Sequence, residues 1–454
     1  MKKKIAIYFA AFVMLFTGVS CMNDDVETVV LSPYAMITSF SLNNIKSSYA
    51  DFTSTGKDTT VVRTIYAAVY PFTIDQLTSE VFNVDSLPFG TDVSKLVVNL
   101  SVKGVAGIYN DSTETYEYFE STDSLDFTKP RKFRVYSADA QYERDYTITV
   151  NVHQVEPELM AWEKFCAPEN FVPESAVEYG GVMKLFGTLA DGSLAVASTS
   201  LDGEPSWETV ALCDLPVAAD LSNVQLFAGS LYVAAEGELY SSVDAVNWAV
   251  APQGVGAEAI VAVSDADGKI WIAGQQGVKY STNGVDFHDS EDLPDRFPLY
   301  GLSLASYPLV HNGNITRYML VGYATPEKDG DVYVWSRLST EDKWERYDNG
   351  NGFGCPGLNN LSVVRYDNFL YAFGGSGVVS GIGVNAFETF FVSKDNGIVW
   401  KASNDFYKRL PGELAGDESQ FAATVDSGNR LWIVNSGDKA CVWRGMVNRL
   451  GFKE

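Results

Sequence analysis

Short runs of alternating apolar and polar residues recur along the chain, and glycine, aspartate and asparagine residues separate them. Residues 37–42 and 146–152 show this alternation clearly. A period of two sends successive side chains to opposite faces of a strand, whereas a helix would repeat every three or four residues. Few stretches show the helical period, so the pattern predicts an all-β chain.

Five such runs lie in the first third of the chain, each bounded by turn residues. They cover residues 37–42, 61–69, 96–102, 132–137 and 146–152. Strands of this length between turns favour two packed sheets. Glu156 and Pro157 mark the end of the region, because proline has no backbone N–H and restricts the residue before it. We therefore expect an immunoglobulin-like β-sandwich over residues 30–156.

A repeat organises the remainder of the chain, residues 157–454. Each unit has two short apolar strands, and five of the six units end near an aromatic residue: Trp207, Trp248, Phe287, Trp344 and Trp400. Units of roughly 50 residues with this periodicity predict a six-bladed β-propeller. The sixth unit lacks an outer strand, which residues 159–165 can supply. Strands from both ends of the domain would then close the propeller and leave no exposed sheet edge.

The N-terminus has the parts of an export signal. Three lysines, at positions 2–4, precede an apolar run over residues 5–17, which is shorter than the roughly 20 residues of a spanning helix. Residues 18–21, Gly-Val-Ser-Cys, resemble the lipobox of bacterial lipoproteins. We therefore expect residues 1–20 to be a lipoprotein signal peptide and Cys21 to carry the lipid. The alternative is a secretory signal followed by an accidental cysteine.

An acidic segment follows Cys21 and bears on the location. Residues 21–29 contain Asp24, Asp25 and Glu27, and we expect them to form a tether. Acidic residues in this place resemble the export signal that sends Bacteroides-type lipoproteins to the cell surface. The sequence thus predicts a protein that its lipid anchors in the outer membrane and that is exposed at the cell surface. The alternative is an anchored protein facing the periplasm.

The charge of the chain narrows the choice of partners. The formal net charge is −25, and removal of residues 1–20 takes away three lysines and no acidic residue, which leaves −28. Such a surface repels nucleic acid and anionic lipid head groups, so we expect contact with the membrane through the N-terminal lipid and no nucleic acid partner. A neutral ligand or a cation is easier to accommodate, and we expect a monomer.

The cysteines other than Cys21 are far apart and include no CxxC pair. They are Cys166, Cys213, Cys355 and Cys441. In an oxidising compartment one or two disulfides can form, but the spacing assigns no pairing. Disulfides and free thiols both remain open.

The sharpest local motif is an Asp-box hairpin over residues 393–400, which matches the pattern S-x-D-x-G-x-x-W. Its defining residues are Ser393, Asp395, Gly397 and Trp400. We expect the carboxylate to accept backbone N–H groups inside the turn, the glycine to adopt a positive φ, and the tryptophan to seal the hairpin between blades. Residues 241–248 and 281–287 are weaker copies. The motif therefore predicts stabilisation of the fold rather than catalysis.

Searches for catalytic and metal-binding patterns give no candidate. Sialidases, some of which are Asp-box propellers, use an Arg-Ile-Pro motif near the start of the propeller, and the nearest approach here is Arg296-Phe297-Pro298 in mid-domain. His153, His288 and His311 do not have the spacing of metal ligands. The chain contains no GxSxG elbow, P-loop or dinucleotide fingerprint. We expect no catalytic residue, no metal and no cofactor.

Two glycine-rich segments suggest where a ligand would bind. Residues 374–383 lie between two predicted strands with no helix after them, which disfavours phosphate binding and favours a flexible loop resembling the kelch di-glycine. Residues 349–354 form a second loop of the same character. Loops are where propellers place ligand contacts. The candidate ligand-face residues are Asn351, Phe353, Gly375, Ser376 and Ser380.

Two further segments resemble one family. Residues 82–93, Phe-Asn-Val-Asp-Ser-Leu-Pro-Phe-Gly-Thr-Asp-Val, resemble the N-x-D-S-L-P-[YF]-G-T segment of Bacteroides-type lipoproteins that carry domain of unknown function 6242. Residues 442–452 resemble the ending of the same family. The resemblance covers nearly the whole mature chain. It implies an N-terminal sandwich followed by a C-terminal propeller, and it assigns no activity.

Two hypotheses of function follow. The first is a surface binding or scaffold protein whose propeller face holds a glycan or a protein, because the anchor, the stalk-like sandwich and the many aromatic residues suit that role. The second is a glycan-directed hydrolase. It requires two carboxylates about 5–10 Å apart in the propeller channel.

Overall fold

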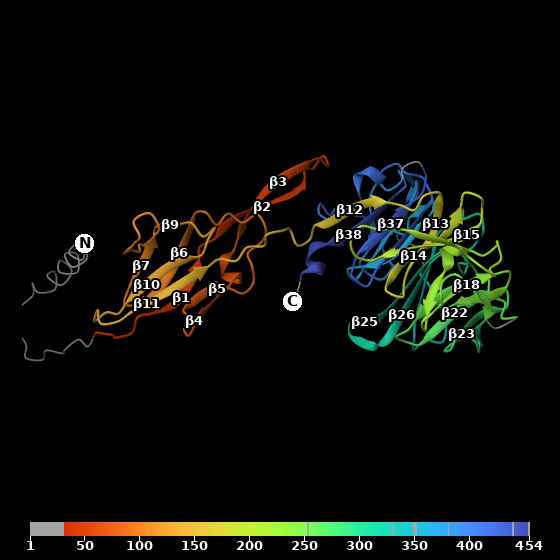
Figure 1. Cartoon of the computed structure of the whole chain (residues 1–454), viewed down its shortest axis with the longest axis horizontal. Coiled ribbons are helices and arrows are strands. Elements are labelled where there is room, and N and C mark those ends of the chain that lie inside the picture. The colour runs from red at the N-terminus through yellow and green to blue at the C-terminus, as the bar shows by residue number, and fades with distance from the viewer. Residues whose placement is uncertain are drawn as a thin grey trace, which may run out of the picture. The chain divides into compact units, whose positions relative to one another are not determined.

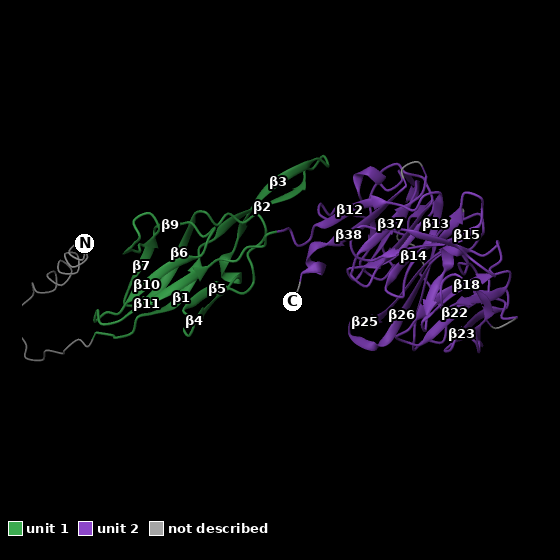
Figure 2. Cartoon of the chain, viewed as in Figure 1, with its two compact units in different colours: residues 1–154 green, residues 155–454 purple. Residues whose placement is uncertain are grey.

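The computed structural model describes residues 31–251, 254–328, 331–347, 352–379, 381–437 and 440–452. The chain divides into two compact units, residues 1–154 and 155–454 (Figure 2). The described residues form strands joined by turns and four short 3-10 helices, which confirms the prediction of an all-β chain. Within these ranges, no helix is long and apolar enough to span a membrane. The predicted signal peptide, Cys21 and the acidic tether lie outside the described residues.

Two sheets and a hairpin make up the first unit. The smaller sheet has the order β1 (Met36–Leu42), β6 (Leu96–Lys103), β9 (Ser124–Leu125). The larger sheet has the order β4 (Phe72–Asp75), β5 (Glu80–Asn83), β11 (Glu143–Thr149), β10 (Arg131–Tyr136), β7 (Val105–Asn110), β8 (Thr115–Tyr118). Strands β2 (Ile45–Phe52) and β3 (Asp58–Ile65) form a separate hairpin.

One apolar core lies between the two sheets of this unit. Ile37 and Phe40 of β1 reach it from the smaller sheet, while Phe133 and Val135 of β10 reach it from the larger one. Alternate residues of β10 are buried, as expected for a strand with one face on a core.

The run predicted as a strand over residues 61–69 ends early in the structure. Strand β3 stops at Ile65, and Ala67–Val69 form the 3-10 helix η1. Pro71 explains the change, because it lacks a backbone N–H and restricts the conformation of Tyr70.

Six four-stranded antiparallel sheets form the second unit. The first contains β13 (Phe171–Tyr179), β14 (Val182–Leu189), β15 (Leu194–Ser200) and β16 (Glu208–Ala211). The second contains β17 (Gln225–Phe227), β18 (Ser230–Ala235), β19 (Glu238–Ser242) and β20 (Ala249–Ala251). The third contains β21 (Ala259–Ser264), β22 (Lys269–Gly274), β23 (Gly277–Ser281) and β24 (His288–Glu291).

The other three sheets follow the same plan. The fourth contains β25 (Tyr300–Leu309), β26 (Asn312–Tyr323), β27 (Tyr333–Leu338) and β28 (Glu345–Arg346). The fifth contains β30 (Ser362–Tyr366), β31 (Phe369–Phe373), β34 (Phe391–Ser393) and β35 (Lys401–Ala402). The sixth contains β36 (Phe421–Val425), β37 (Leu431–Asn435), β38 (Cys441–Val447) and β12 (Met160–Cys166). Short 3-10 helices lie between strands at η2 (Leu221–Asn223) and η3 (Gly412–Leu414) and after β38 at η4 (Asn448–Gly451).

The sixth sheet joins the beginning and the end of the second unit. Strand β12 pairs with β38 from Met160↔Val447 to Cys166↔Cys441, and Figure 1 shows the two side by side in yellow and blue. Across this pair, Arg444 Nη2 lies 2.7 Å from Glu163 Oε2. These two residues are 281 positions apart in the sequence.

Apolar clusters fill the spaces between neighbouring sheets. Trp271 of the third sheet, for example, packs with Tyr318 and Trp335 of the fourth. The sixth and first sheets also share a cluster, in which Trp432 packs with Met183 and Leu185. We call the first strand of each sheet in chain order its inner strand. In the sixth sheet this name is given to β36, because β12 lies at the opposite edge. These inner strands, β13, β17, β21, β25, β30 and β36, each contact the next, and β36 contacts β13.

The glycine-rich segment 374–383, expected to be a flexible loop, contains strands in the structure. β32 (Gly377–Val379) and β33 (Ile382–Val384) join β29 (Gly357–Leu358) in a small sheet. At Gly377 a Cβ atom would lie 2.0 Å from the carbonyl oxygen of Gly357. The glycine is therefore needed for close approach of two backbones rather than for flexibility.

Candidate functional site

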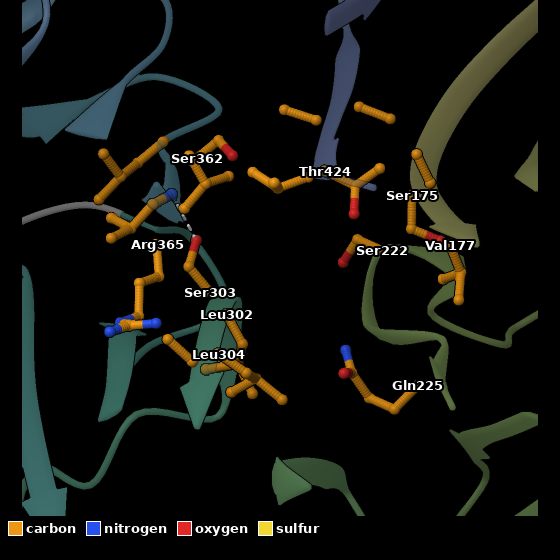
Figure 3. A pocket seen from close by; sticks show the side chains of 18 of the residues that line it. Ser175, Val177, Ser222, Gln225, Leu302, Ser303, Leu304, Ser362, Arg365 and Thr424 are labelled. Carbon is orange, nitrogen blue, oxygen red and sulfur yellow. Dashed lines mark hydrogen bonds between the residues drawn. The ribbon is translucent and has the colours of Figure 1, made fainter. Parts of the chain in front are cut away.

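The inner strands of all six sheets surround one cavity, which we call the central cavity (Figure 3). Its volume is about 1080 Å³. Each of the six strands contributes lining residues, among them Ser175, Gln225, Val263, Leu304, Arg365 and Thr424. A cavity of this size can hold a small oligosaccharide or a molecule of similar dimensions.

Inner strands have one edge without a strand partner, so their backbone groups need other partners. Side chains of neighbouring sheets supply several of them. The side-chain amide of Asn223 accepts from Ile260 N at 2.9 Å and donates to Ile260 O at 3.1 Å. The backbone N–H of Val363 donates to Ser303 Oγ at 2.9 Å (Figure 3). These bonds hold adjacent inner strands in register around the cavity.

Several polar side chains of the lining keep unused hydrogen-bonding capacity. Seven hydroxyl or amide side chains make no hydrogen bond with any described residue: Ser175, Gln225, Asn360, Ser362, Gln420, Thr424 and Asn429. Figure 3 shows Gln225 and Thr424 directed toward the open space from different strands. Hydroxyl and amide groups both donate and accept hydrogen bonds, so the lining offers both to a ligand.

Three of the lining carboxylates are already engaged. Glu178 accepts from Ser427 N at 2.6 Å and from Ser427 Oγ at 2.8 Å. Asp265 accepts from Ala228 N at 3.0 Å. Asp367 forms ion pairs with two basic side chains outside the lining, those of Lys408 and Arg449. These groups are therefore held by the fold.

Glu174 differs from these three carboxylates. Burial, together with the nearby Asp220 carboxylate, raises the pKa of its carboxyl to about 7, while the charge of Lys328 acts in the opposite direction. Close to neutral pH this group exchanges between acid and carboxylate. It is the lining residue with the properties of a proton donor.

Arg365 brings a positive charge to the cavity. Its Cζ lies 4.2 Å from the centre of the Tyr307 ring, and Nη2 donates to Asn368 Oδ1 at 3.0 Å. Burial lowers the pKa of the guanidinium. Within the described ranges, no carboxylate oxygen lies within 4.0 Å of it.

The Asp-box turn lies between sheets rather than in the cavity. Ser393 Oγ donates to Asp395 Oδ1 at 2.8 Å and accepts from Gly397 N at 2.8 Å. Asp395 also accepts from Val399 N at 2.9 Å. Gly397 has a φ of +91°, and the buried Trp400 donates from Nε1 to its carbonyl oxygen. The turn thus satisfies its own polar groups while its aromatic ring packs between the fourth and fifth sheets.

The two weaker copies of the Asp-box form similar hydrogen bonds within their turns, and in one of them the serine is one position later than expected. In the first copy Ser242, rather than Ser241, binds the turn, and its Oγ lies 3.1 Å from Asp244 Oδ1. In the second copy the amide oxygen of Asn283 replaces the carboxylate and accepts from Val285 N at 2.9 Å. An amide oxygen can accept these bonds as a carboxylate does.

The three described candidate ligand-face residues, Gly375, Ser376 and Phe353, have different surroundings. Gly375 N donates to Asn359 O at 2.8 Å, and Asn359 lines the central cavity; the next residue, Ser376, donates from its backbone N to the Glu418 carboxylate at 3.1 Å. Phe353 instead lies beside the outer strand β35, where Lys401 Nζ is 5.4 Å from its ring. Asn351 and Ser380 lie outside the described residues.

Other candidates from the sequence lie away from the cavity. The four described cysteines are free thiols, so no disulfide joins Cys166, Cys213, Cys355 or Cys441. Arg296 is exposed and lies near Asp295. Over the part of the chain that the structure describes, no three His, Cys, Asp or Glu side chains are grouped as metal ligands would be.

The sequence analysis missed the residues that line the cavity. It located the second and third strands of each unit through their aromatic residues, but not the inner strands before them. An available signal was a short run ahead of each of those strands, such as residues 362–366, where a charged residue interrupts apolar ones. That signal alone does not say that six such runs surround one space.

Comparison with protein families gives two matches that together span most of the chain. The model of the DUF6242 beta propeller domain matches residues 156–454. The model of the DUF6242 N-terminal domain matches residues 40–150. A search of curated proteins finds no match to the sequence.

Several solved structures resemble the chain at low identity. A DUF4623 family protein from Bacteroides eggerthii is 12% identical, with 91% of this chain and 98% of that chain covered and a TM-score of 0.35. The gluconolactonase XC5397 from Xanthomonas campestris is 11% identical, with 75% and 94% covered and a TM-score of 0.37. A sialidase from Trypanosoma rangeli is 13% identical, with 63% and 55% covered and a TM-score of 0.34. TM-scores this low support no inference about activity.

Proposed function

The chain belongs to the DUF6242 family, and we propose that it binds a carbohydrate in the central cavity of a closed six-bladed propeller. We also propose that a lipid on Cys21 anchors it at a cell surface. The single observation that carries the binding role is the set of hydroxyl and amide side chains in the cavity that have no hydrogen-bond partner among the described residues.

The closed propeller is supported by a cyclic arrangement of sheets. Each of the six sheets shares an apolar cluster with the next, including the sixth with the first. The pairing of β12 with β38 lets the last sheet take its outer strand from the start of the unit. In this arrangement the six sheets are the blades, and the central cavity lies on the axis.

The anchored location rests on the sequence of the N-terminus. An apolar run too short to span a membrane is followed by small residues and Cys21, and then by an acidic tether. In this proposal the immunoglobulin-like sandwich of the first unit acts as a stalk for the propeller.

The chemistry of the lining favours a carbohydrate. A sugar presents several hydroxyl groups, each able to donate and accept a hydrogen bond, and the unpaired groups of Gln225, Ser362 and Thr424 can match them. Aliphatic side chains such as Leu302 and Leu304 lie between these polar groups and can contact the apolar faces of sugar rings. Among the described residues these polar groups have no hydrogen-bond partner, so a ligand or water must satisfy them.

A glycan array with the full chain in detergent micelles tests the proposal. We expect binding of a subset of glycans, and we expect the double variant Gln225→Ala/Thr424→Val to weaken it about tenfold, because two hydrogen bonds are lost. The matched control is Gln275→Ala/Thr188→Val, which changes the same residue types outside the cavity. An array without binding, or equal binding by the two double variants, would contradict the proposal.

A second candidate function, a glycan hydrolase, is favoured by Glu174. A carboxyl group with a pKa of about 7 beside the carboxylate of Asp220 resembles the acid and base pairs of glycosidases. The same glycans incubated with the protein distinguish the two roles. Cleavage products that disappear with Glu174→Gln would favour the hydrolase, whereas unchanged glycans favour binding alone.

A further inference from the structure

We propose that the carbohydrate bound in the central cavity carries a carboxylate, as a uronic acid does, and that Arg365 binds this group. This inference rests on the proposed binding function and adds the charge of the ligand to it.

Arg365 is a charged side chain with most of its hydrogen bonds unused. A guanidinium has five N–H donors, and the structure shows one of them engaged, with the neutral Asn368 side chain. The side chain is half-buried, and its burial disfavours the charged form. A partly buried cation without a counter-charge is unfavourable, and a ligand carboxylate would supply that charge through two parallel hydrogen bonds.

Several other basic side chains of the second unit have a carboxylate partner in the protein. Arg337 lies 3.7 Å from Glu291, and Arg430 Nε lies 2.7 Å from Asp426 Oδ2. Within the described residues Arg317 also has no carboxylate partner. It donates instead to two hydroxyl groups, those of Ser336 at 3.0 Å and Tyr347 at 2.8 Å, and it does not line the cavity. Arg365 therefore combines an unpaired charge with a place in the cavity.

The protein holds this guanidinium in a defined orientation. It stacks on the ring of Tyr307, and the Tyr307 hydroxyl forms a hydrogen bond of 2.9 Å with Asn396 Oδ1. Asn396 belongs to the Asp-box turn, whose own hydrogen bonds fix its backbone. Tyr307 and Asn396 are thus positioning residues, because they set the plane of Arg365 without reaching the ligand. A fixed guanidinium plane is what bidentate binding of a carboxylate requires.

The acidic composition of the chain does not prevent this binding. Among the carboxylates of the lining, Glu178 and Asp265 accept hydrogen bonds and Asp367 is paired with basic side chains. Charges elsewhere on the surface are screened over about 8 Å at physiological ionic strength. Within the described residues no carboxylate forms an ion pair with Arg365, so its charge is available to a ligand although the whole chain is negative.

Calorimetric titration of the full chain in detergent tests the inference with two probes that share a sugar backbone and differ in the charge of the carboxyl groups. These are trigalacturonate and the same trisaccharide with its carboxylates methyl-esterified. We expect wild type to bind the acid about tenfold or more tightly than the ester, since charge-assisted bonds are stronger than neutral ones. Arg365→Gln should remove this preference by weakening binding of the acid more than binding of the ester, whereas Arg346→Gln, outside the cavity, should keep it.

Two further measurements keep the result interpretable. Added salt should weaken the binding of the acid by wild type more than that of the ester, and Arg365→Lys should retain part of the preference. Equal binding of acid and ester by wild type overturns the inference and leaves the carbohydrate proposal standing. If neither probe binds while the array shows glycan binding, the inference about Arg365 is overturned and the carbohydrate proposal stands. If the array shows no binding, both the inference and the carbohydrate proposal are overturned. Equal loss of acid and ester binding in Arg365→Gln would contradict the role of Arg365 in binding a carboxylate. Binding of an acidic peptide in preference to trigalacturonate would contradict a carbohydrate ligand for this residue.

Discussion

The second unit has two kinds of interior space: the spaces between its sheets and the central cavity. The side chains that line them differ in size and polarity. Between sheets the side chains are large, aromatic and buried, as with Trp271 and Trp432. Around the cavity, hydroxyl and amide side chains such as those of Gln225 and Thr424 are mixed with aliphatic ones such as Leu304. The same inner strands contribute to both regions, so the difference lies in which side chains face each space.

This difference separates stability from recognition. The indole N–H groups of Trp271, Trp335 and Trp344 have no hydrogen-bond partner among the described residues, so these rings stabilise the unit through apolar contact. The cavity also contains groups without partners, but they lie beside open space that a ligand can enter. Substitution between sheets should therefore affect folding, and substitution in the cavity should affect binding.

The largest expected effect is on folding, from Trp271→Ala. Removing this fully buried ring leaves a void between the third and fourth sheets and should lower the free energy of unfolding by about 3–5 kcal/mol. Denaturant titration followed by circular dichroism measures it. Trp207→Ala, at a partly exposed ring, serves as the control and should cost clearly less. Similar losses for both variants would break the contrast between buried and peripheral aromatic residues.

A smaller loss of stability is expected for Asp395→Ala in the Asp-box turn. The carboxylate accepts from Ser393 Oγ and Val399 N, so its removal should cost about 1–2 kcal/mol. The exposed neighbour Ile398 provides Ile398→Ala as a control in the same turn, with an expected change below about 0.5 kcal/mol. Thermal unfolding curves of the two variants would decide the matter. An unchanged melting temperature for Asp395→Ala would show that the turn bonds contribute little.

The smallest expected effect on stability comes from the cavity and depends on pH. The pKa of Glu174 is about 7 in the folded chain against 4.5 for a free side chain. The folded state therefore keeps a proton that the unfolded state loses, so stability falls as pH rises from about 4.5 to about 7 and is level above that. Because solvent screens this half-exposed group, the loss should be about 1 kcal/mol.

Comparing wild type with Glu174→Gln isolates this contribution from the other acidic groups. The variant should lose less stability than wild type between pH 4.5 and pH 7, as measured by unfolding at closely spaced pH values. Parallel curves for the two proteins would mean that the Glu174 carboxyl is not held in its neutral form.

Sequence alone predicted the features that repeat and missed those that depend on the assembled ring. Aromatic residues such as Trp248 and Trp400 recur at regular intervals and mark the sheets, and the all-β class follows from alternation. Gln225 and Thr424 occur in strands of only three and five residues, which are too short to show a clear period in the sequence. The isolation of Arg365 from carboxylates is a property of three-dimensional neighbours, which no spacing reveals.

Loop character was the weakest basis for placing a site. The glycine-rich segments were expected to share one ligand face, but Gly375 lies near the cavity and Phe353 lies beside an outer strand. Glycine at position 377 serves a close backbone contact instead of mobility. The glycine content marked segments with unusual backbone geometry, but it did not indicate which of these segments lie near the cavity.

The pairing of β12 with β38 has a consequence for how the chain is made. The sixth sheet cannot be completed until its last strand has left the ribosome, because its outer strand comes from residues synthesised near the start of the unit. Contacts between such distant residues form slowly during folding. A nascent chain interrupted before Cys441 would carry an unpaired β12 and an exposed apolar surface, which quality-control proteases can recognise. The order of synthesis thus delays completion of the sixth sheet until the last strand of the unit has been made.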